Sequence, residues 1–180
     1  MLHTKLIPPP VTSDHISRPN VMKEFDKGRN LPLIAVTAPA GYGKSIAVSE
    51  WINRSARQHC WLTLDENLNQ ISIFYEYFIA AIEVTHPDSL KMSKRLIQNA
   101  TVLTTSALTN QLIAEFQAIG RPFTIVLDDF HSIKNLEIHE LVSQLINANL
   151  INWYFIIISR NELPNSFQSL AFYNKIHRIG

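Results

Sequence analysis

Residues 38–45 have the types and the order that a phosphate-binding loop requires. Gly41 and Gly43 can adopt backbone angles that are closed to other residues, so successive amide hydrogens can converge on phosphate oxygens at the start of a helix. Lys44 would then reach the outer phosphates, and the Ser45 hydroxyl would ligate magnesium. The residues expected to bind the nucleotide within this loop are Gly41, Tyr42, Gly43, Lys44 and Ser45.

The motif departs from the phosphate-loop pattern at one position, because Ala38 replaces the first glycine. A methyl group there narrows the accessible backbone angles. A random chain of this size would contain Gly-x-Gly-Lys-Ser/Thr with a chance of roughly one in a hundred. The alternative interpretation is a glycine-rich turn that merely caps a helix.

Two acidic residues and an arginine follow later apolar runs and could complete the site. Asp128, directly after the run 123–127, is the candidate for the magnesium side. Asp129 stands where a base would orient the attacking water, but its carboxylate is one methylene shorter than glutamate, so we expect slow hydrolysis. Arg160 ends a further run and could touch the terminal phosphate. The alternatives are a turn-forming acid pair and a surface arginine.

Short apolar runs that alternate with helical patterns must position these residues. We predict strands at 33–37, 60–64, 123–127 and 153–158, and a candidate fifth strand at 175–179. The third and fourth runs are nearly continuously apolar, as parallel strands covered on both faces are. The chain is therefore predicted to be an α/β protein, a P-loop NTPase three-layer α/β/α sandwich with a mostly parallel sheet of about five strands. Its ligand would lie at the carboxyl ends of the strands, with 33–37 central.

Helical spacing of apolar residues places helices around 46–52, 71–82, 106–116 and 138–146, with Ser106 as the cap of the third. Residues 85–105 are predicted to be a mixed connector. Three prolines at positions 8–10 disfavour helix, so residues 1–30 are predicted to be an extended lead-in on the nucleotide side. Residues 31–180 would form the nucleotide-binding domain, cut short at its carboxyl end.

Composition excludes several classes of function. The 180 residues are 46% hydrophobic and carry 16 Lys and Arg against 15 Asp and Glu, which gives no electrostatic footprint for DNA or anionic lipid. No apolar run approaches the roughly 20 residues that span a bilayer. A single cysteine, Cys60, in an apolar stretch indicates an inert buried thiol and a cytoplasmic location. His139-Glu140 lacks the second histidine of a zinc protease helix, so packing or surface histidines are expected.

Several separated stretches together resemble the amino-terminal ATPase module of the large ATP-binding LuxR-type transcription regulators, the MalT-like branch of the STAND NTPases. The resemblance covers nearly the whole chain, and the family often has alanine or serine where Ala38 stands. The stretches that carry it are Thr4-Lys5-Leu6-Ile7-Pro8, Ile16-Ser17-Arg18-Pro19, the loop 38–45, Trp61-Leu62-Thr63-Leu64-Asp65-Glu66, Leu127-Asp128-Asp129-Phe130-His131, Ile138-His139-Glu140 and Ser159-Arg160.

The resemblance implies a role for each matching residue. Arg18 and its neighbours would contact the nucleotide from the amino-terminal side, Asp128 would serve magnesium and Asp129 hydrolysis, and Arg160 would sense the terminal phosphate. Two departures stand out: Leu68-Asn69 replaces an Asp-Asn pair, and Ser45 replaces a more usual threonine. Family members continue into winged-helix, helical-repeat and helix-turn-helix domains. The expected partners are therefore those other domains and further copies of the regulator, with neither DNA nor membrane bound by this segment.

Three functional hypotheses follow. The leading one is a regulatory module that binds ATP and Mg2+ and acts as a switch with slow hydrolysis. A stand-alone P-loop ATPase or kinase is the second, and a degenerate interaction module without nucleotide is the third. The lack of a glutamate in the acid pair and of a second substrate motif disfavours a fast enzyme, whereas intact Gly43, Lys44, Ser45 and Asp128 disfavour degeneracy.

Overall fold

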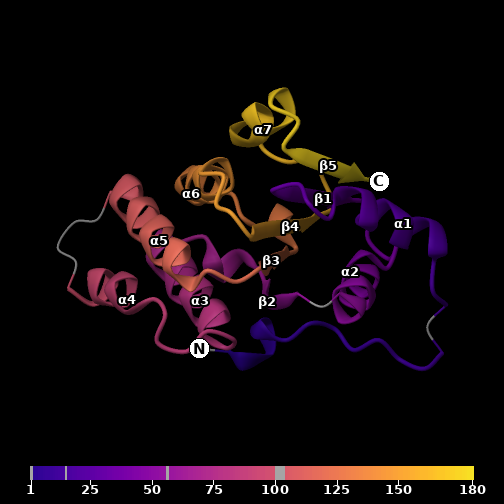
Figure 1. Ribbon diagram of the computed structural model, residues 1–180, viewed down its shortest axis with the longest axis horizontal. Helices are drawn as coiled ribbons and strands as arrows, with labels where there is room; N and C mark the ends of the chain where they lie inside the picture. Colours follow the sequence, from indigo (N-terminus) through magenta and orange to yellow (C-terminus); the bar gives the residue numbers. More distant parts are fainter. Residues whose placement is uncertain (1, 15, 56, 100–103) are drawn as a thin grey trace.

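A parallel five-stranded sheet forms the middle layer of the protein (Figure 1). The computed structural model describes residues 2–14, 16–55, 57–99 and 104–180. The sheet order is β2-β3-β4-β1-β5, and every neighbouring pair runs parallel. The predicted α/β class is confirmed. The strands are β1 (Leu33–Thr37), β2 (Gln58–Thr63), β3 (Phe123–Asp128), β4 (Trp153–Ser159) and β5 (Ile176–Ile179).

Strand β1 is internal, as expected, but it is not the middle strand. It lies between β4 and β5, and β4 occupies the centre of the sheet. Strand β4 is buried at almost every position because it has strands on both sides and helices on both faces. Strand β1 is buried at almost every position as well. Both strands are therefore apolar runs in the sequence, and this pattern does not tell which of them lies at the centre of the sheet.

Helices cover both faces of the sheet and complete the three layers. Alternate residues of β1 illustrate the division: Ile34 and Val36 pack in one apolar cluster with α1 and α2, and Leu33 packs in another with α3, α5 and α6. Figure 1 shows these two groups of helices on opposite sides of the strands. The helices are α1 (Pro19–Gly28), α2 (Lys44–Arg54), α3 (Ile71–Glu83), α4 (Lys91–Gln98), α5 (Thr105–Ile119), α6 (Leu136–Asn147) and α7 (Gln168–Phe172).

The lead-in is less extended than predicted. A 3-10 helix at His3–Leu6 and helix α1 both fall within residues 1–30, so the expectation of extended backbone is wrong for these two stretches. Pro19 occupies the first turn of α1, where its missing N–H costs nothing, and Met22 and Phe25 are buried on one face of the helix. The division into a lead-in and a domain from residue 31 stays a prediction.

The connector and the helix after it also differ from expectation. Residues 85–105 contain helix α4, and residues 100–103 of this connector lie outside the described part. Helix α5 begins at Thr105, and its cap is the Thr104 side chain, which accepts a hydrogen bond from the Ala107 amide at 3.2 Å. Ser106 is therefore not the cap. Among the described residues, no helix is both long enough and apolar enough to cross a bilayer.

The end of α1 approaches β5 so closely that only glycine fits. A Cβ atom added to Gly28 would lie 2.8 Å from the Cβ atom of His177. We expect Gly28→Ala to lower the free energy of unfolding by about 1 to 2 kcal/mol, because overpacking outweighs the better helix propensity of alanine. Urea denaturation measures this change. Lys23→Ala, at an exposed position on the same helix, is the control, and equal stability of the two variants would contradict the prediction.

Candidate functional site

The loop between β1 and α2 has the backbone that the two glycines were predicted to supply. Gly41 has φ of 82° and Gly43 has φ of 71°, both in the region that L side chains rarely adopt. Gly43 is the residue immediately before α2, and its carbonyl accepts the first helical hydrogen bond from the Ala47 amide at 2.9 Å. The loop therefore directs the amides of the first turn of α2 toward one point, as an anion site requires.

Lys44 curls back over the loop. Its ammonium group donates to the carbonyl oxygens of Ala38, at 2.6 Å, and Pro39, at 2.9 Å. These bonds hold a positive charge against the phosphate loop. A lysine side chain is flexible, so the ammonium group can exchange these carbonyls for the oxygens of a bound phosphate.

Ser45 and Asp128 meet although 83 positions separate them in the sequence. The Ser45 hydroxyl donates to Asp128 Oδ1 at 2.9 Å. Asp128 ends β3 and is 5% exposed. Burial raises the pKa of its carboxyl group to about 6, the charge of Asp129 adds to this effect, and the hydrogen bond from Ser45 opposes it. The two residues predicted for the metal side are therefore adjacent.

Asp129 and Arg160 lie on the rim of a hollow of about 220 Å3 that Lys44 and Ser45 also line. Asp129 has φ of 56°, which is uncommon for a residue other than glycine and is typical of strained backbone at functional sites. Its amide donates to Asp128 Oδ1 at 2.9 Å, which fixes the turn after β3. Arg160 follows the last residue of β4 on the same edge of the sheet. The structure thus brings together the predicted residues from three strand ends.

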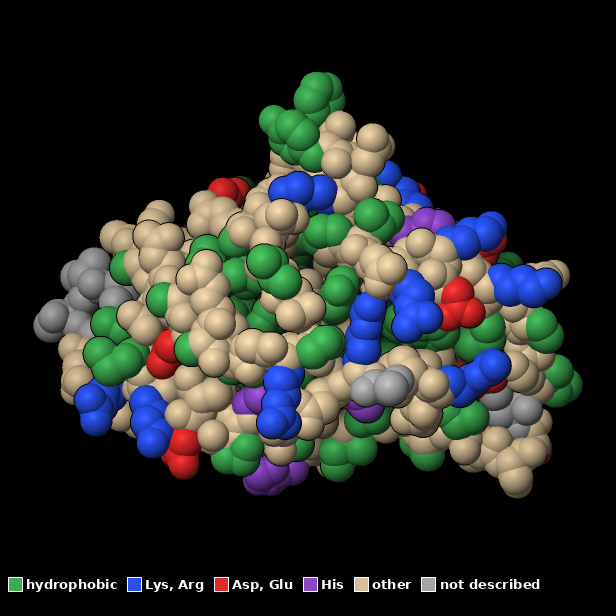
Figure 2. All heavy atoms as spheres, viewed as in Figure 1, with side chains coloured by type: hydrophobic (Ala, Val, Ile, Leu, Met, Phe, Trp, Pro, Cys, Tyr) green, Lys and Arg blue, Asp and Glu red, His purple; other side chains and the backbone are tan. Residues whose placement is uncertain are grey.

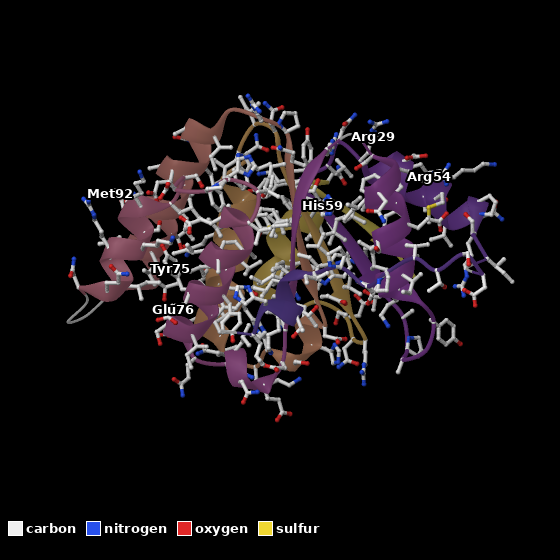
Figure 3. The ribbon with its side chains drawn as sticks, turned by 90° about the horizontal axis from the view of Figure 1, so that it is seen from below. Arg29, Arg54, His59, Tyr75, Glu76 and Met92 are labelled. Carbon is white, nitrogen blue, oxygen red and sulfur yellow. The ribbon has the colours of Figure 1, made fainter. Side chains whose placement is uncertain are left out.

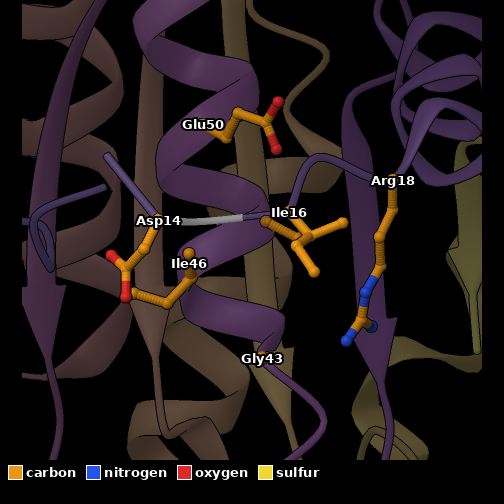
Figure 4. A pocket seen from close by; sticks show the side chains of 7 residues that line it. Asp14, Ile16, Arg18, Gly43, Ile46 and Glu50 are labelled. Atoms are coloured by element: carbon orange, nitrogen blue, oxygen red, sulfur yellow. The ribbon is translucent and has the colours of Figure 1, made fainter. Parts of the chain in front are cut away.

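A second hollow, of about 460 Å3, adjoins the loop on the side of the lead-in (Figure 4). The Arg18 side chain reaches from the lead-in toward Gly43, and its Nη1 atom donates to the Tyr42 carbonyl at 3.0 Å. Ser17 Oγ donates to Glu50 Oε1 at 2.5 Å, so the lead-in is also joined to α2. The lining residues are Asp14, Ile16, Arg18, Gly43, Ile46, Ala47 and Glu50.

Two residues of this hollow were missed in the sequence. Asp14 carries no motif, and Glu50 lies one helical turn after Ile46, which places it on the same face of α2. That spacing was visible, but the sequence contains no signal that residues 14–18 pack against this face of α2.

Asn69, in the pair that departs from the family pattern, joins the segments that follow β2 and β3. Its Oδ1 atom accepts from the amides of Lys134, at 2.6 Å, and Asn135, at 3.2 Å, and its Nδ2 atom donates to the Ser132 carbonyl at 3.0 Å. Asn69→Ala would leave two amides without this acceptor. We expect a loss of about 1 to 3 kcal/mol in the free energy of unfolding.

Guanidinium denaturation measures this loss, and Asn67→Ala is the matched control. Asn67 is exposed, and its side chain makes one long hydrogen bond of 3.4 Å to Asp65. The control is expected to change stability by less than about 0.5 kcal/mol. If Asn67→Ala lost as much unfolding free energy as Asn69→Ala, the hydrogen bonds of the Asn69 side chain to residues 132–135 would contribute nothing specific to stability.

The donor set fits magnesium in particular. Ser45 and Asp128 offer two hard oxygen ligands, and among the described residues no three His, Cys, Asp or Glu side chains gather as a complete metal site. Magnesium is usually held by one or two protein oxygens, and phosphate and water oxygens complete its octahedron. A zinc site of nitrogen and sulfur ligands would need more protein ligands than these two.

The histidine and the cysteine considered in the sequence have packing roles. His139 is buried, its Nε2 atom lies 3.0 Å from the Ile133 carbonyl, and its ring packs on Phe130. Cys60 is buried in β2, and burial raises the pKa of its thiol far above the ordinary value. The expected burial of Cys60 and the packing role of His139 are confirmed.

The parallel sheet, the glycine loop between β1 and α2 and the acidic end of the nearby strand β3 define the fold class as a P-loop NTPase. Solved structures share this fold. A Signal Transduction ATPase with Numerous Domains (STAND) protein with a tetratricopeptide repeat sensor from Pyrococcus horikoshii matches 96% of this chain and 24% of its own, with a TM-score of 0.64 and 14% identity. CDC6P from Pyrobaculum aerophilum matches 99% of this chain and 49% of its own, with a TM-score of 0.62 and 11% identity.

Sequence comparison points to one kind of protein within this class. The HTH-type transcriptional regulator MalT of two Klebsiella pneumoniae strains is 30% identical over 172 residues. The match covers 95% of this chain and 19% of MalT, so the chain spans about a fifth of these curated relatives. No protein-family model matches. The predicted resemblance is confirmed: the chain is similar in sequence to MalT over 95% of its own length, and it shares its fold with the STAND protein of Pyrococcus horikoshii.

Proposed function

We propose that the chain is the ATP- and Mg2+-binding regulatory module of a MalT-like LuxR-family transcription regulator, and that it acts as a nucleotide-dependent switch with slow hydrolysis. The observation that carries this proposal is the 2.9 Å contact between Ser45 Oγ and Asp128 Oδ1 beside the glycine loop. A hydroxyl and a carboxylate this close can bind one metal ion, and the loop can bind the phosphates that share it.

The two hollows beside the loop suggest how the nucleotide is held. The smaller one would take the terminal phosphate, with Lys44 and Arg160 supplying positive charge and Asp129 placed to orient water. The larger one offers apolar surface from Ile16 and Ile46 and would take the base and sugar, with Arg18 between the two regions. When bound, magnesium would neutralise phosphate charge. The choice of adenine is part of this proposal and rests on the resemblance to the ATP-binding LuxR-type regulators.

The positions of Arg18, Asp129 and Arg160 support a role as a switch, which does not require rapid hydrolysis. Arg160 and Asp129 belong to segments after different strands, and Arg18 belongs to the lead-in. A nucleotide that contacts all three would stabilise one arrangement of these segments over another, which is differential affinity for two states. The full-length regulator would be cytoplasmic, and its other domains and further copies of it would bind the two states differently. This segment itself would contact neither DNA nor membrane.

Calorimetry and a turnover assay on the purified chain test the proposal. We expect binding of ATP that depends on magnesium, together with turnover below about 0.01 per second, in the range of NTPases that await a partner. Turnover above about 1 per second would support a stand-alone ATPase. A chain that binds neither ATP nor ADP would support the degenerate interaction module.

A further inference from the structure

A third hollow, of about 400 Å3, lies at the end of α2 opposite to the phosphate loop. Helix α2 has 11 residues, so roughly 16 Å separate its two ends. The hollow opens where α1 ends, α2 ends and β2 begins, and Figure 3 shows Arg29 and Arg54 on this side of the molecule. Its lining residues are Met22, Asp26, Arg29, Trp51, Arg54, Ser55 and Arg57.

Arg57 is held in place within this hollow. Its guanidinium group lies over the Tyr154 ring, 3.9 Å from the centroid, and donates to the Arg29 carbonyl and to Asn30 Oδ1. Three separate contacts therefore order a side chain that is otherwise flexible. An ordered guanidinium fork loses little conformational entropy when it binds an anion.

The positive charges around the hollow are only partly compensated. Among the hydrogen bonds and ion pairs of the described residues, none uses the Arg29 side chain, and Arg54 is 3.7 Å from Glu50. The one carboxylate that lines the hollow, Asp26, accepts from Trp51 Nε1 at 2.9 Å. Burial, and secondarily the charge of Arg29, lower the pKa of Arg57. Figure 2 shows Lys and Arg side chains gathered in the half of the view where α1 and α2 lie.

We propose that this hollow is an anion site that binds a phosphate-bearing small molecule through Arg29, Arg54 and Arg57. The three guanidinium groups are offset by two carboxylates, Asp26 in the lining and Glu50, which pairs with Arg54, so one positive charge is left in excess. A phosphate group carries negative charge and offers more acceptor oxygens than the two of a carboxylate, so it can accept hydrogen bonds from several guanidinium groups at once. The volume exceeds what one phosphate group needs, so the hollow has room for further atoms of the bound molecule. The site does not depend on the nucleotide proposed for the other end of α2.

Inorganic pyrophosphate is the probe, and the indole N–H signals of the three tryptophans are the readout by NMR. Trp51 lines the hollow, whereas the Trp61 indole donates to Thr63 and the Trp153 indole to the Phe116 carbonyl. The titration uses the Lys44→Ala chain at constant ionic strength, so that binding at the phosphate loop is reduced. We expect a saturable shift of the Trp51 signal with a Kd between about 10 μM and 1 mM, and no comparable shift of the other two.

Arg29→Gln is the decisive variant, because this side chain is exposed and none of the hydrogen bonds of the described residues uses it, so its loss should not disturb the fold. We expect it to weaken pyrophosphate binding at least about fivefold, as loss of a charged hydrogen bond does. Arg95→Gln removes the same charge from an exposed position on α4 and should change nothing. Arg57→Gln should weaken binding further, provided that its thermal unfolding matches the parent.

Several outcomes would overturn the proposal. These are the lack of a saturable Trp51 shift in the Lys44→Ala chain, and an equal loss of binding in Arg29→Gln and Arg95→Gln. A hexaglutamate peptide and a short DNA duplex are tested in parallel. If either binds with the Arg29 dependence and pyrophosphate does not, the site belongs to an acidic protein segment or to nucleic acid, and the assignment to a small phosphate is wrong.

Discussion

Replacing Lys44 by alanine is expected to weaken binding of ATP with magnesium by about tenfold to a hundredfold. A hydrogen bond to a charged group contributes roughly 1.5 to 3 kcal/mol, and this range sets the expected loss of affinity. Lys44 is the first residue of α2, and its ammonium group already lies against the loop carbonyls of Ala38 and Pro39. The charge that the phosphates would meet is therefore in place before they bind.

Isothermal titration calorimetry on parent and variant measures this effect. Lys91→Ala removes a lysine that is 64% exposed on α4 and serves as the matched control for net charge. The Lys44→Ala variant should also keep its stability to within about 1 kcal/mol, because the bond that it loses to the Pro39 carbonyl is exposed and the bond to the Ala38 carbonyl is only partly buried. Equal affinities of parent and Lys44→Ala would contradict the role assigned to this lysine, and an equal loss in Lys91→Ala would show a nonspecific effect of charge.

Replacing Asp128 by asparagine is expected to stabilise the protein at pH 7 while it removes the dependence of nucleotide binding on magnesium. The pKa of Asp128 is about 6 in the folded chain against an ordinary value of 3.8. A carboxylate that is harder to ionise when folded costs stability at neutral pH, by about 3 kcal/mol for a difference of about two pKa units. An asparagine Oδ1 atom can still accept from Ser45 and from the Asp129 amide, and it carries no charge to bury.

The stabilisation expected from Asp128→Asn depends on pH, because the carboxyl group of Asp128 loses its proton at a higher pH in the folded chain than in the unfolded chain. At pH 3 and below the carboxyl group is almost fully protonated in both folded and unfolded chains, so it costs almost nothing. Between pH 4 and 6 the unfolded chain loses its proton while folded Asp128 keeps it, so this group lowers stability as the pH rises, and above pH 6 its cost is complete. The advantage of Asp128→Asn should therefore be near zero at pH 3 and about 3 kcal/mol at pH 7.

Urea denaturation at the two pH values, in buffer with EDTA, measures the advantage, and calorimetry with and without magnesium measures the functional cost. Asp88→Asn, at a position that is 77% exposed, is the control and should show no such pH dependence. A variant that is less stable than the parent at pH 7 would contradict the buried-charge explanation. Unchanged dependence on magnesium would contradict the metal role.

Parts of the site that depend on local backbone chemistry could be predicted from the sequence. The two glycines, the lysine and the serine stand within five positions. The positive φ angles of Gly41 and Gly43 follow from their residue type. The strands were visible as apolar runs, and the acid pair as the end of one run. Helix α1 was not predicted, although Pro19, Met22 and Phe25 have helical positions, because the three prolines at 8–10 favour extended backbone early in the same segment.

Contacts between distant segments were decided only by the tertiary structure. The sequence by itself determined a phosphate loop, an α/β alternation and an acidic strand end, because each depends on residues close together in the chain. The order of the strands, the reach of Arg18 to Tyr42 and the gathering of Arg29, Arg54 and Arg57 come from which faces pack together. Burial of apolar surface is not directional, so many pairings satisfy the same sequence pattern, and only the complete packing selects one of them.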